Sequence, residues 1–197
     1  MSEKRVTPAR KEVMESSLEL LLIEIVRWFV YGWKNGRDPQ KTDAGNGSAD
    51  VDQIAGSLNR KLALTNAVHG MGYDVGQRLI ERLSTDHLKM ETNLEVVKYI
   101  CKDFWEETFK KQIDVLKTNN KGRFVLQDNN FRWIRKASRN DPSQLKVEDF
   151  LTFPAGIVCG AMNRLGVDCT VSADAASAPM CIFTVEIAQP PNNSRQQ

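Results

Sequence analysis

The stretch HGMGYDVGQRLIERL, residues 69–83, contains glycines at positions 70, 72 and 76, where a Gly-rich turn could hold a phosphate. A dinucleotide-binding turn needs the spacing G-x-G-x-x-G directly after a strand. Here the spacing is G-x-G-x-x-x-G, and the preceding LALTNAVH does not alternate as a strand does. Gln77 follows Gly76 where a P-loop requires lysine, so that motif fails as well. We therefore expect no nucleotide site.

Gly70 and Gly72 should turn the chain into a helix. Gly76 should leave the helix without a side chain where another element approaches closely, so we expect Gly76→Leu to damage assembly.

Nucleophilic catalysis is not indicated either, since the nucleophile usually needs a histidine beside it. His69 and His87 are the two histidines, and neither pairs with a serine or cysteine motif. We interpret both as solvent-exposed turn residues. Asp74 and Glu81 are seven apart and share a helical face, which is ordinary for a surface helix and predicts no acid–base site. The sequence thus predicts no catalytic residue.

Cysteine spacing argues against a metal or disulfide site. None of the cysteines stands in a C-x-x-C pair, and no secretory signal precedes them. We interpret them as reduced, buried thiols of a cytosolic protein, and we expect neither metal nor cofactor. They are Cys101, Cys159, Cys169 and Cys181.

Composition limits the remaining classes. The chain has 197 residues, of which 41% are hydrophobic, so we expect one domain over residues 1–190 and a disordered tail at 191–197. A net charge of +2 supplies no general attraction to nucleic acid. The apolar stretch at 18–33 contains Glu19, Glu24 and Arg27 and is too short and too charged to span a membrane.

The first helix, from Pro8 to about Val30, has only one narrow polar stripe. An ordinary surface helix buries about a third of its circumference, so this helix should also cover a partner protein; a central place in the chain's own core is the alternative. The segment from Asn35 to Ala63 is predicted to be a flexible insert, with a loop over 35–50 and a possible short helix across Ile54–Leu62.

Further along, Thr92 and Glu95 form a capping box that begins a core helix running to about Lys117. RFVLQDNNFRWIR, residues 123–135, is predicted to form two strands around a QDNN turn, and residues 136–149 a loop. A helix over 153–166 should start near Pro154 and end at Gly166, with Gly156 and Gly160 on one bare face. Strands are expected over 169–173 and 181–187. The apolar face of the core helix is predicted to comprise Leu94, Val97, Ile100, Cys101, Phe104, Trp105, Phe109, Ile113 and Leu116.

Three segments then carry a family resemblance: GMGYDVGQRLIERL, VVKYICKDFWEETFKKQIDVLKTNNKGRFVLQDNNFR, and FPAGIVCGAMNRLG with the closing CIFTVEI. Together they resemble the TRAPP small-subunit (Bet-type) family, over about residues 12–34 and 66–188. The resemblance implies an α+β fold with several helices packed on a four-stranded antiparallel sheet. This agrees with the four strands counted from the sequence.

The resemblance also implies a function without an active site. TRAPP is a vesicle tether and a guanine-nucleotide exchange factor for a Rab GTPase in ER-to-Golgi and Golgi transport. A small subunit of this kind is expected to be a structural component that pairs with the third-subunit paralogue through its first two helices and contacts other small subunits. Contact with the Rab GTPase would be indirect. The implied location is the cytoplasm, peripheral at the cis-Golgi and endoplasmic reticulum, with membrane contact only through the complex.

The predicted partner interface combines the over-wide apolar face of the first helix with three positions on the next. A fatty acid carried on a cysteine in the third-subunit paralogue is not expected here, because no cysteine occurs before Cys101. The alternative function is a small-molecule or acyl-binding module of the same fold. The predicted interface residues are Leu18, Leu21, Leu22, Ile25, Trp28, Phe29, Val75, Leu79 and Leu83.

Overall fold

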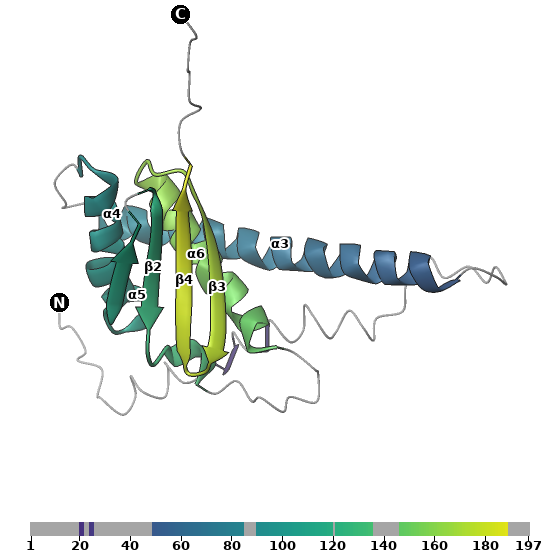
Figure 1. Ribbon diagram of the computed structural model, residues 1–197. Helices are drawn as coiled ribbons and strands as arrows, with labels where there is room; N and C mark the ends of the chain where they lie inside the picture. The colour runs from purple at the N-terminus through teal and green to yellow at the C-terminus, as the bar shows by residue number, and fades with distance from the viewer. Residues whose placement is uncertain are drawn as a thin grey trace, which may run out of the picture.

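In the computed structural model, helices cover one face of a four-stranded sheet, and the longest helix extends well past that sheet (Figure 1). The structure describes residues 20, 21, 24, 25, 49–84, 90–119, 121–135 and 146–188. Several predictions fall outside these residues. They concern most of the first helix, the loop over 35–48, His87, the loop over 136–145 and the tail at 191–197.

The longest helix, α3, runs without a break from Ala49 to Leu83. The predicted turn at Gly70 and Gly72 is therefore wrong, because both glycines lie inside this helix. Ile54–Leu62 is helical as predicted, but it is part of the long helix and not a separate short one. Each interior glycine costs a helix about 1 kcal/mol relative to alanine. The packing of α3 against a second helix, described below, offsets that cost.

The capping box at Thr92 is confirmed. Glu95 N donates to Thr92 Oγ1 at 3.2 Å and Thr92 N donates to Glu95 Oε2 at 3.3 Å, which starts α4 (Asn93–Tyr99). The helix continues through a π-helical segment, η2 (Ile100–Phe104), and then α5 (Trp105–Phe109).

The end of this helix differs from the prediction of about Lys117. Lys110 adopts a left-handed conformation with φ of 64°, which stops the helix. Leu116 then lies in a strand, and Leu94 is exposed instead of buried. The apolar spacing predicted too long a helix because Ile113 and Leu116 continue the helical repeat in sequence. Both residues do pack against the core, but they do so after the helix has ended.

The sheet is antiparallel throughout, in the order β1-β2-β4-β3, and it confirms the predicted four-stranded α+β fold. Two hairpins build it, but the first hairpin is placed earlier than predicted. The segment after QDNN forms a short 3-10 helix, η3 (Arg132–Ile134), because Asp128 Oδ1 accepts from Asn130 N and turns the chain away from the sheet. The strands are β1 (Val115–Thr118), β2 (Arg123–Asp128), β3 (Cys169–Ser177) and β4 (Met180–Ile187).

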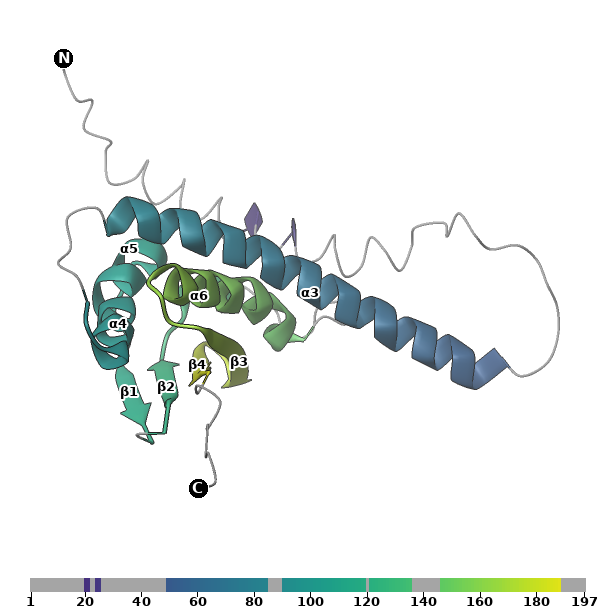
Figure 2. The ribbon, with the colours of Figure 1, turned by 90° about the horizontal axis from the view of Figure 1, so that it is seen from above.

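Helix α6 (Thr152–Arg164) follows a 3-10 turn, η4 (Val147–Leu151), and lies between the sheet and α3 (Figure 2). Pro154 stands in its first turn, and Gly166 has φ of 86° just past its end, as predicted. Because α6 is covered on two sides, residues 154–162 are all buried. An aromatic cluster of Trp105, Phe109, Phe131 and Phe183 fills the core beside the sheet.

Candidate partner interface

Glycines on both helices form the crossing of α3 and α6. A Cβ atom on Gly72 would lie 3.1 Å from Ile157 N, and one on Gly156 would lie 3.0 Å from Tyr73 N. A Cβ on Gly76 would collide with the backbone carbonyl of Ile157, and one on Gly160 with that of Tyr73. Each helix thus lays its backbone against the other through a G-x-x-x-G pair. The prediction that Gly76 admits a close neighbour is confirmed, whereas Gly70 faces open space.

This crossing holds only the C-terminal half of α3 on the body. The N-terminal half projects beyond α6 and the sheet (Figures 1 and 2). An ion pair between Lys61 Nζ and Asp149 Oδ1, at 3.7 Å, lies where the helix leaves the body. With Lys61 more than half exposed, this pair adds little stability.

Two leucines on the projecting half face solvent. Leu58 is 66% exposed and Leu62 is 59% exposed, and their spacing of four places both on one helical face. Leu58 precedes Gly76 by about five helical turns, and Leu62 precedes Ile80 by the same distance. The face of α3 that packs on the body therefore continues as an apolar surface where the body has ended. Covering each leucine would contribute about 1.5–3 kcal/mol.

A second row on α3 contains the predicted interface positions. Val75 is 38% exposed and available to a partner, and half-buried Leu64 and Met71 precede it at helical spacing. Leu79 and Leu83 pack partly against the chain's own core, so they offer a partner less surface than Val75 does.

The predicted positions on the first helix are covered only in part by the structure. Leu21 is exposed and Ile25 is half-buried, and both are helical. Leu20, which was not predicted, is also exposed. Leu18, Leu22, Trp28 and Phe29 lie outside the described residues.

Leu58 and Leu62 were missed by the sequence reasoning. Their separation of four in a stretch of good helix formers was the available signal. It was weak, because a helix without an intramolecular partner along its length shows no sustained apolar repeat.

The histidine and carboxylates that could serve in catalysis do not form a common site in the described residues. His69 is inside α3 and half-buried, instead of in an exposed turn, and burial lowers its pKa and so favours the neutral ring. Glu81 pairs with Arg164 at 2.7 Å, away from Asp74, whose side chain is exposed. Over the described ranges, no three His, Cys, Asp or Glu side chains gather closely enough to hold a metal ion.

The most buried polar group serves the fold. Asp128 is fully buried, and its carboxylate accepts from Trp105 Nε1 at 3.1 Å and Lys111 Nζ at 2.8 Å. Lys111 also donates to Asp114 at 2.6 Å. Burial by itself would lower the pKa of Lys111, but the hydrogen bonds and charges of the two carboxylates raise it. This polar cluster ties the end of α5 to β2.

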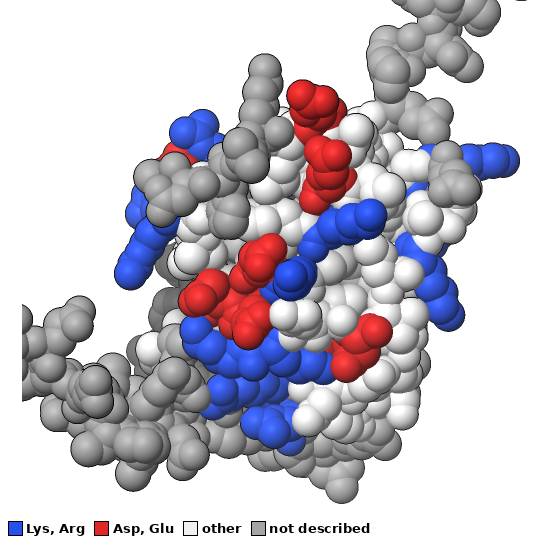
Figure 3. Space-filling view, turned by 90° about the vertical axis from the view of Figure 1, so that its left-hand side faces the viewer, with Lys and Arg blue, Asp and Glu red and all other residues white. Residues whose placement is uncertain are grey.

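Charges on the face that carries α4, α5 and β1 are mixed in sign (Figure 3). Lys and Arg side chains alternate there with Asp and Glu side chains, so that face forms no single-sign field for a polyanion. Among the helices of the described ranges, none is both long and apolar enough to traverse a lipid bilayer.

Comparisons with known proteins agree with this architecture. The profile of the transport protein particle (TRAPP) component family matches residues 18–188. Trafficking protein particle complex subunit 6b of Danio rerio is 44% identical over 120 residues, which are 61% of this chain and 76% of that protein. Subunit 6A of Homo sapiens is 38% identical over 136 residues, which are 69% of this chain and 85% of that protein.

A solved structure shares the fold. It is the crystal structure of a trafficking protein particle complex subunit 3 from Naegleria fowleri covalently bound to palmitic acid, with a TM-score of 0.57 and 13% identity. The match covers 89% of this chain and 97% of that one. On its sequence the chain therefore belongs to the TRAPP component family, in the branch of subunit 6.

Proposed function

We propose that this chain is a non-catalytic structural subunit of a TRAPP complex that pairs with the third-subunit paralogue. The observation that carries the proposal is the apolar surface of α3, where Leu58, Leu62 and Val75 are exposed although they are large and hydrophobic. Large apolar side chains that continue a packing face are typical of protein interfaces. Membership in a family of complex components supports the same conclusion.

The glycine crossing gives this surface a fixed shape. Because the backbones of α3 and α6 are in contact, a partner meets a helix that is already oriented, and little ordering entropy is lost on binding. The acyl-binding alternative is not favoured, since the relatives at 38–44% identity are named as complex subunits.

The wider role follows from the assembly. As a TRAPP component, the chain would act in vesicle tethering and Rab guanine-nucleotide exchange between the endoplasmic reticulum and the Golgi. It would contact other small subunits directly and the Rab GTPase only indirectly. Its place would be the cytoplasm and the peripheral surface of cis-Golgi and endoplasmic reticulum membranes, reached through the complex.

Co-expression with the third-subunit TRAPP paralogue tests the pairing. We expect a one-to-one complex that survives affinity purification through a tag on either chain and elutes as a single heterodimer in size-exclusion chromatography with light scattering. Separate elution of the two chains at micromolar concentration would contradict the proposal. Co-expression with an unrelated small protein of similar charge is the control.

The proposal also holds that this subunit carries no fatty acid. Cys101 is buried within the π-helical segment η2, and burial raises its pKa to about 12, so its thiol is a poor nucleophile. The intact mass of the full chain purified from eukaryotic cells should match the unacylated sequence. A palmitoyl adduct would contradict this expectation.

A further inference from the structure

Two cysteines, one in α6 and one at the start of β3, lie against each other. Cys159 is buried in α6, and Cys169 is the first residue of β3 and half-exposed. The Sγ of Cys159 donates to the carbonyl oxygen of Cys169 at 3.3 Å, so the two cysteines are in direct contact. Both are free thiols.

Their surroundings make one of them the better nucleophile. The hydrogen bond from the Cys169 thiol lowers the pKa of Cys159, against the opposing effect of burial. The same contact, together with burial, raises the pKa of Cys169. A lowered pKa increases the thiolate fraction, which is the form that oxidants attack.

The other two cysteines provide an internal contrast. Cys101 and Cys181 are buried, and burial raises the pKa of both. Cys159 is as buried as Cys101, so what makes Cys101 and Cys181 the poorer nucleophiles is their raised pKa. Reactivity should therefore concentrate at the pair of Cys159 and Cys169.

The position of Cys169 allows it to move toward its neighbour. It begins an edge strand, so only one side of its backbone pairs with another strand. Gly166, in a left-handed conformation, lies three residues before it in the connection from α6. Cys159, in contrast, is held in the middle of a buried helix. A shift of the strand end would bring the sulfur of Cys169 toward that of Cys159, which already contacts the Cys169 backbone.

We propose that Cys159 and Cys169 form a reversible dithiol–disulfide modification site that hydrogen peroxide oxidises. The Cys159 thiolate attacks one peroxide oxygen, the O–O bond breaks, and with one proton taken up a sulfenic acid and one water form. The Cys169 thiol then attacks the sulfenic sulfur, its proton leaves with the hydroxyl as a second water, and the S–S bond closes. The two sulfurs together lose two electrons, which the peroxide gains.

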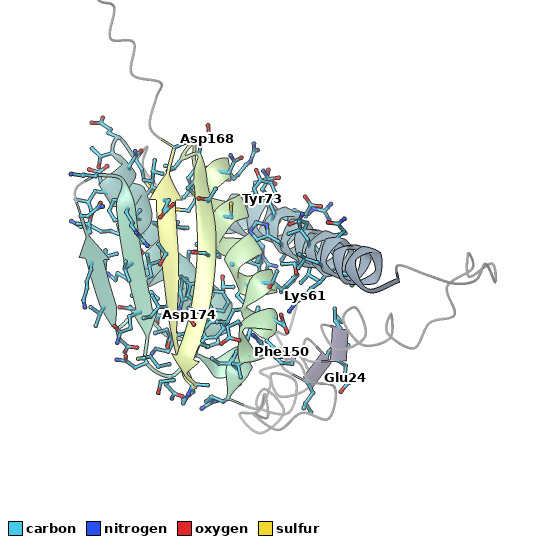
Figure 4. All side chains as sticks on the ribbon, turned by 45° about the vertical axis from the view of Figure 1, so that its right-hand side comes forward. Glu24, Lys61, Tyr73, Phe150, Asp168 and Asp174 are labelled. Atoms are coloured by element: carbon cyan, nitrogen blue, oxygen red, sulfur yellow. The ribbon has the colours of Figure 1, made fainter. Side chains whose placement is uncertain are left out.

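Tyr73 links this site to α3. Its side chain extends from α3 toward α6, at the end of the molecule where Asp168 lies (Figure 4). Burial and then the charges of Cys159, Asp168 and Cys169 raise the pKa of Tyr73, and the Tyr73 backbone carbonyl lies against Gly160, the residue after Cys159. Closing the disulfide therefore alters the surroundings of a residue on the helix that we assign to the partner.

Peptide mapping of the full chain tests the proposal. Fully reduced protein is exposed to hydrogen peroxide, remaining thiols are alkylated, and the digest is analysed by mass spectrometry. We expect a cross-linked peptide pair joining Cys159 to Cys169, an intact mass lower by two hydrogens, and full recovery of both thiols with dithiothreitol. Before oxidation, Cys159 should be alkylated faster than Cys101, because the pKa of Cys159 is lowered and that of Cys101 is raised while the two thiols are equally buried.

Variants sharpen the outcome. Cys169→Ser should remove the cross-link and leave a sulfenic acid on Cys159 that dimedone traps, whereas the matched control Cys101→Ala should form the cross-link as the wild type does. The wild-type measurements stand alone if a variant fails to fold. Absence of the Cys159–Cys169 peptide, oxidation of Cys101 or Cys181 at an equal rate, or irreversible oxidation without a disulfide would each overturn the proposal.

Discussion

At Gly76 the missing side chain determines whether two helices can touch. Gly76 and Gly70 share α3 and have helical backbones, so they differ only in what a methyl group would meet. A methyl group on Gly76 would enter the Ile157 backbone, which cannot rotate away as a side chain could, whereas one on Gly70 would meet nothing within 4 Å.

Gly76→Ala should therefore destabilise the chain by at least about 2 kcal/mol, because the helices must separate to admit the methyl group. Gly70→Ala should stabilise it by about 0.5–1 kcal/mol, since alanine loses less backbone entropy in a helix. Urea unfolding of both variants beside the wild type measures the two effects. Equal effects at the two positions would show that the crossing tolerates a side chain.

Asp114 makes stability depend on pH. Hydrogen bonds from Lys111 and from the backbone N–H of Asn129 hold the pKa of Asp114 below its ordinary value. Asp114 therefore contributes to the free energy of unfolding at pH values above its unfolded-state pKa of about 3.9. That contribution is lost as the pH falls through the lower pKa of the folded state. The stability advantage of the wild type over Asp114→Asn, measured by urea unfolding, should shrink between pH 7 and acid pH. An advantage that does not change with pH would contradict this assignment.

At the scale of elements, α3 has two parts with different roles. Its C-terminal half carries the glycines and core residues that fix it to α6, and its N-terminal half carries the exposed leucines Leu58 and Leu62. Substitutions in the C-terminal half of α3 should therefore affect fold stability, and substitutions in the N-terminal half should affect partner binding.

The double variant Leu58→Ser with Leu62→Ser should leave the free energy of unfolding within about 0.5 kcal/mol of the wild type, because both side chains are exposed. Binding to the third-subunit paralogue should weaken by about tenfold or more, as buried leucine surface is lost from the interface. Calorimetric titration measures the affinity. A double variant that binds as tightly as the wild type would remove the projecting half from the interface.

At the scale of the whole molecule, the sheet covers one side of α6 and α3 the other, so a partner can approach only from outside this stack (Figure 2). The first helix supplies the other expected half of the contact surface. Its described part includes exposed Leu21 and half-buried Ile25.

Ile25→Asp should abolish the one-to-one complex, since an unpaired carboxylate in a water-excluded interface costs several kcal/mol. Lys102→Asp, on the exposed side of η2, is the matched control and should leave pairing intact. Pull-down and analytical ultracentrifugation of both co-expressed variants give the comparison. Wild-type pairing of Ile25→Asp would place the interface on another face of the molecule.

Local interactions made several features predictable from the sequence. The box of Thr92 with Glu95, Pro154 in the first turn of α6 and Gly166 beyond its end are each determined by a few neighbouring residues. The alternation around Phe183 and Val185 likewise predicted a strand, because a strand with one buried face must alternate.

By itself, the sequence thus determined the fold class, the family and the absence of a phosphate-binding motif at the glycines. Only the tertiary structure decided that these glycines lie inside one long helix, that the helix after Thr92 ends at Lys110, and that residues 115–118 form a strand. The physical reason is that glycine in a local sequence indicates a turn. Gly76 is instead required within a helix, because the backbone carbonyl of Ile157, more than 80 residues away in sequence, leaves no room for a side chain.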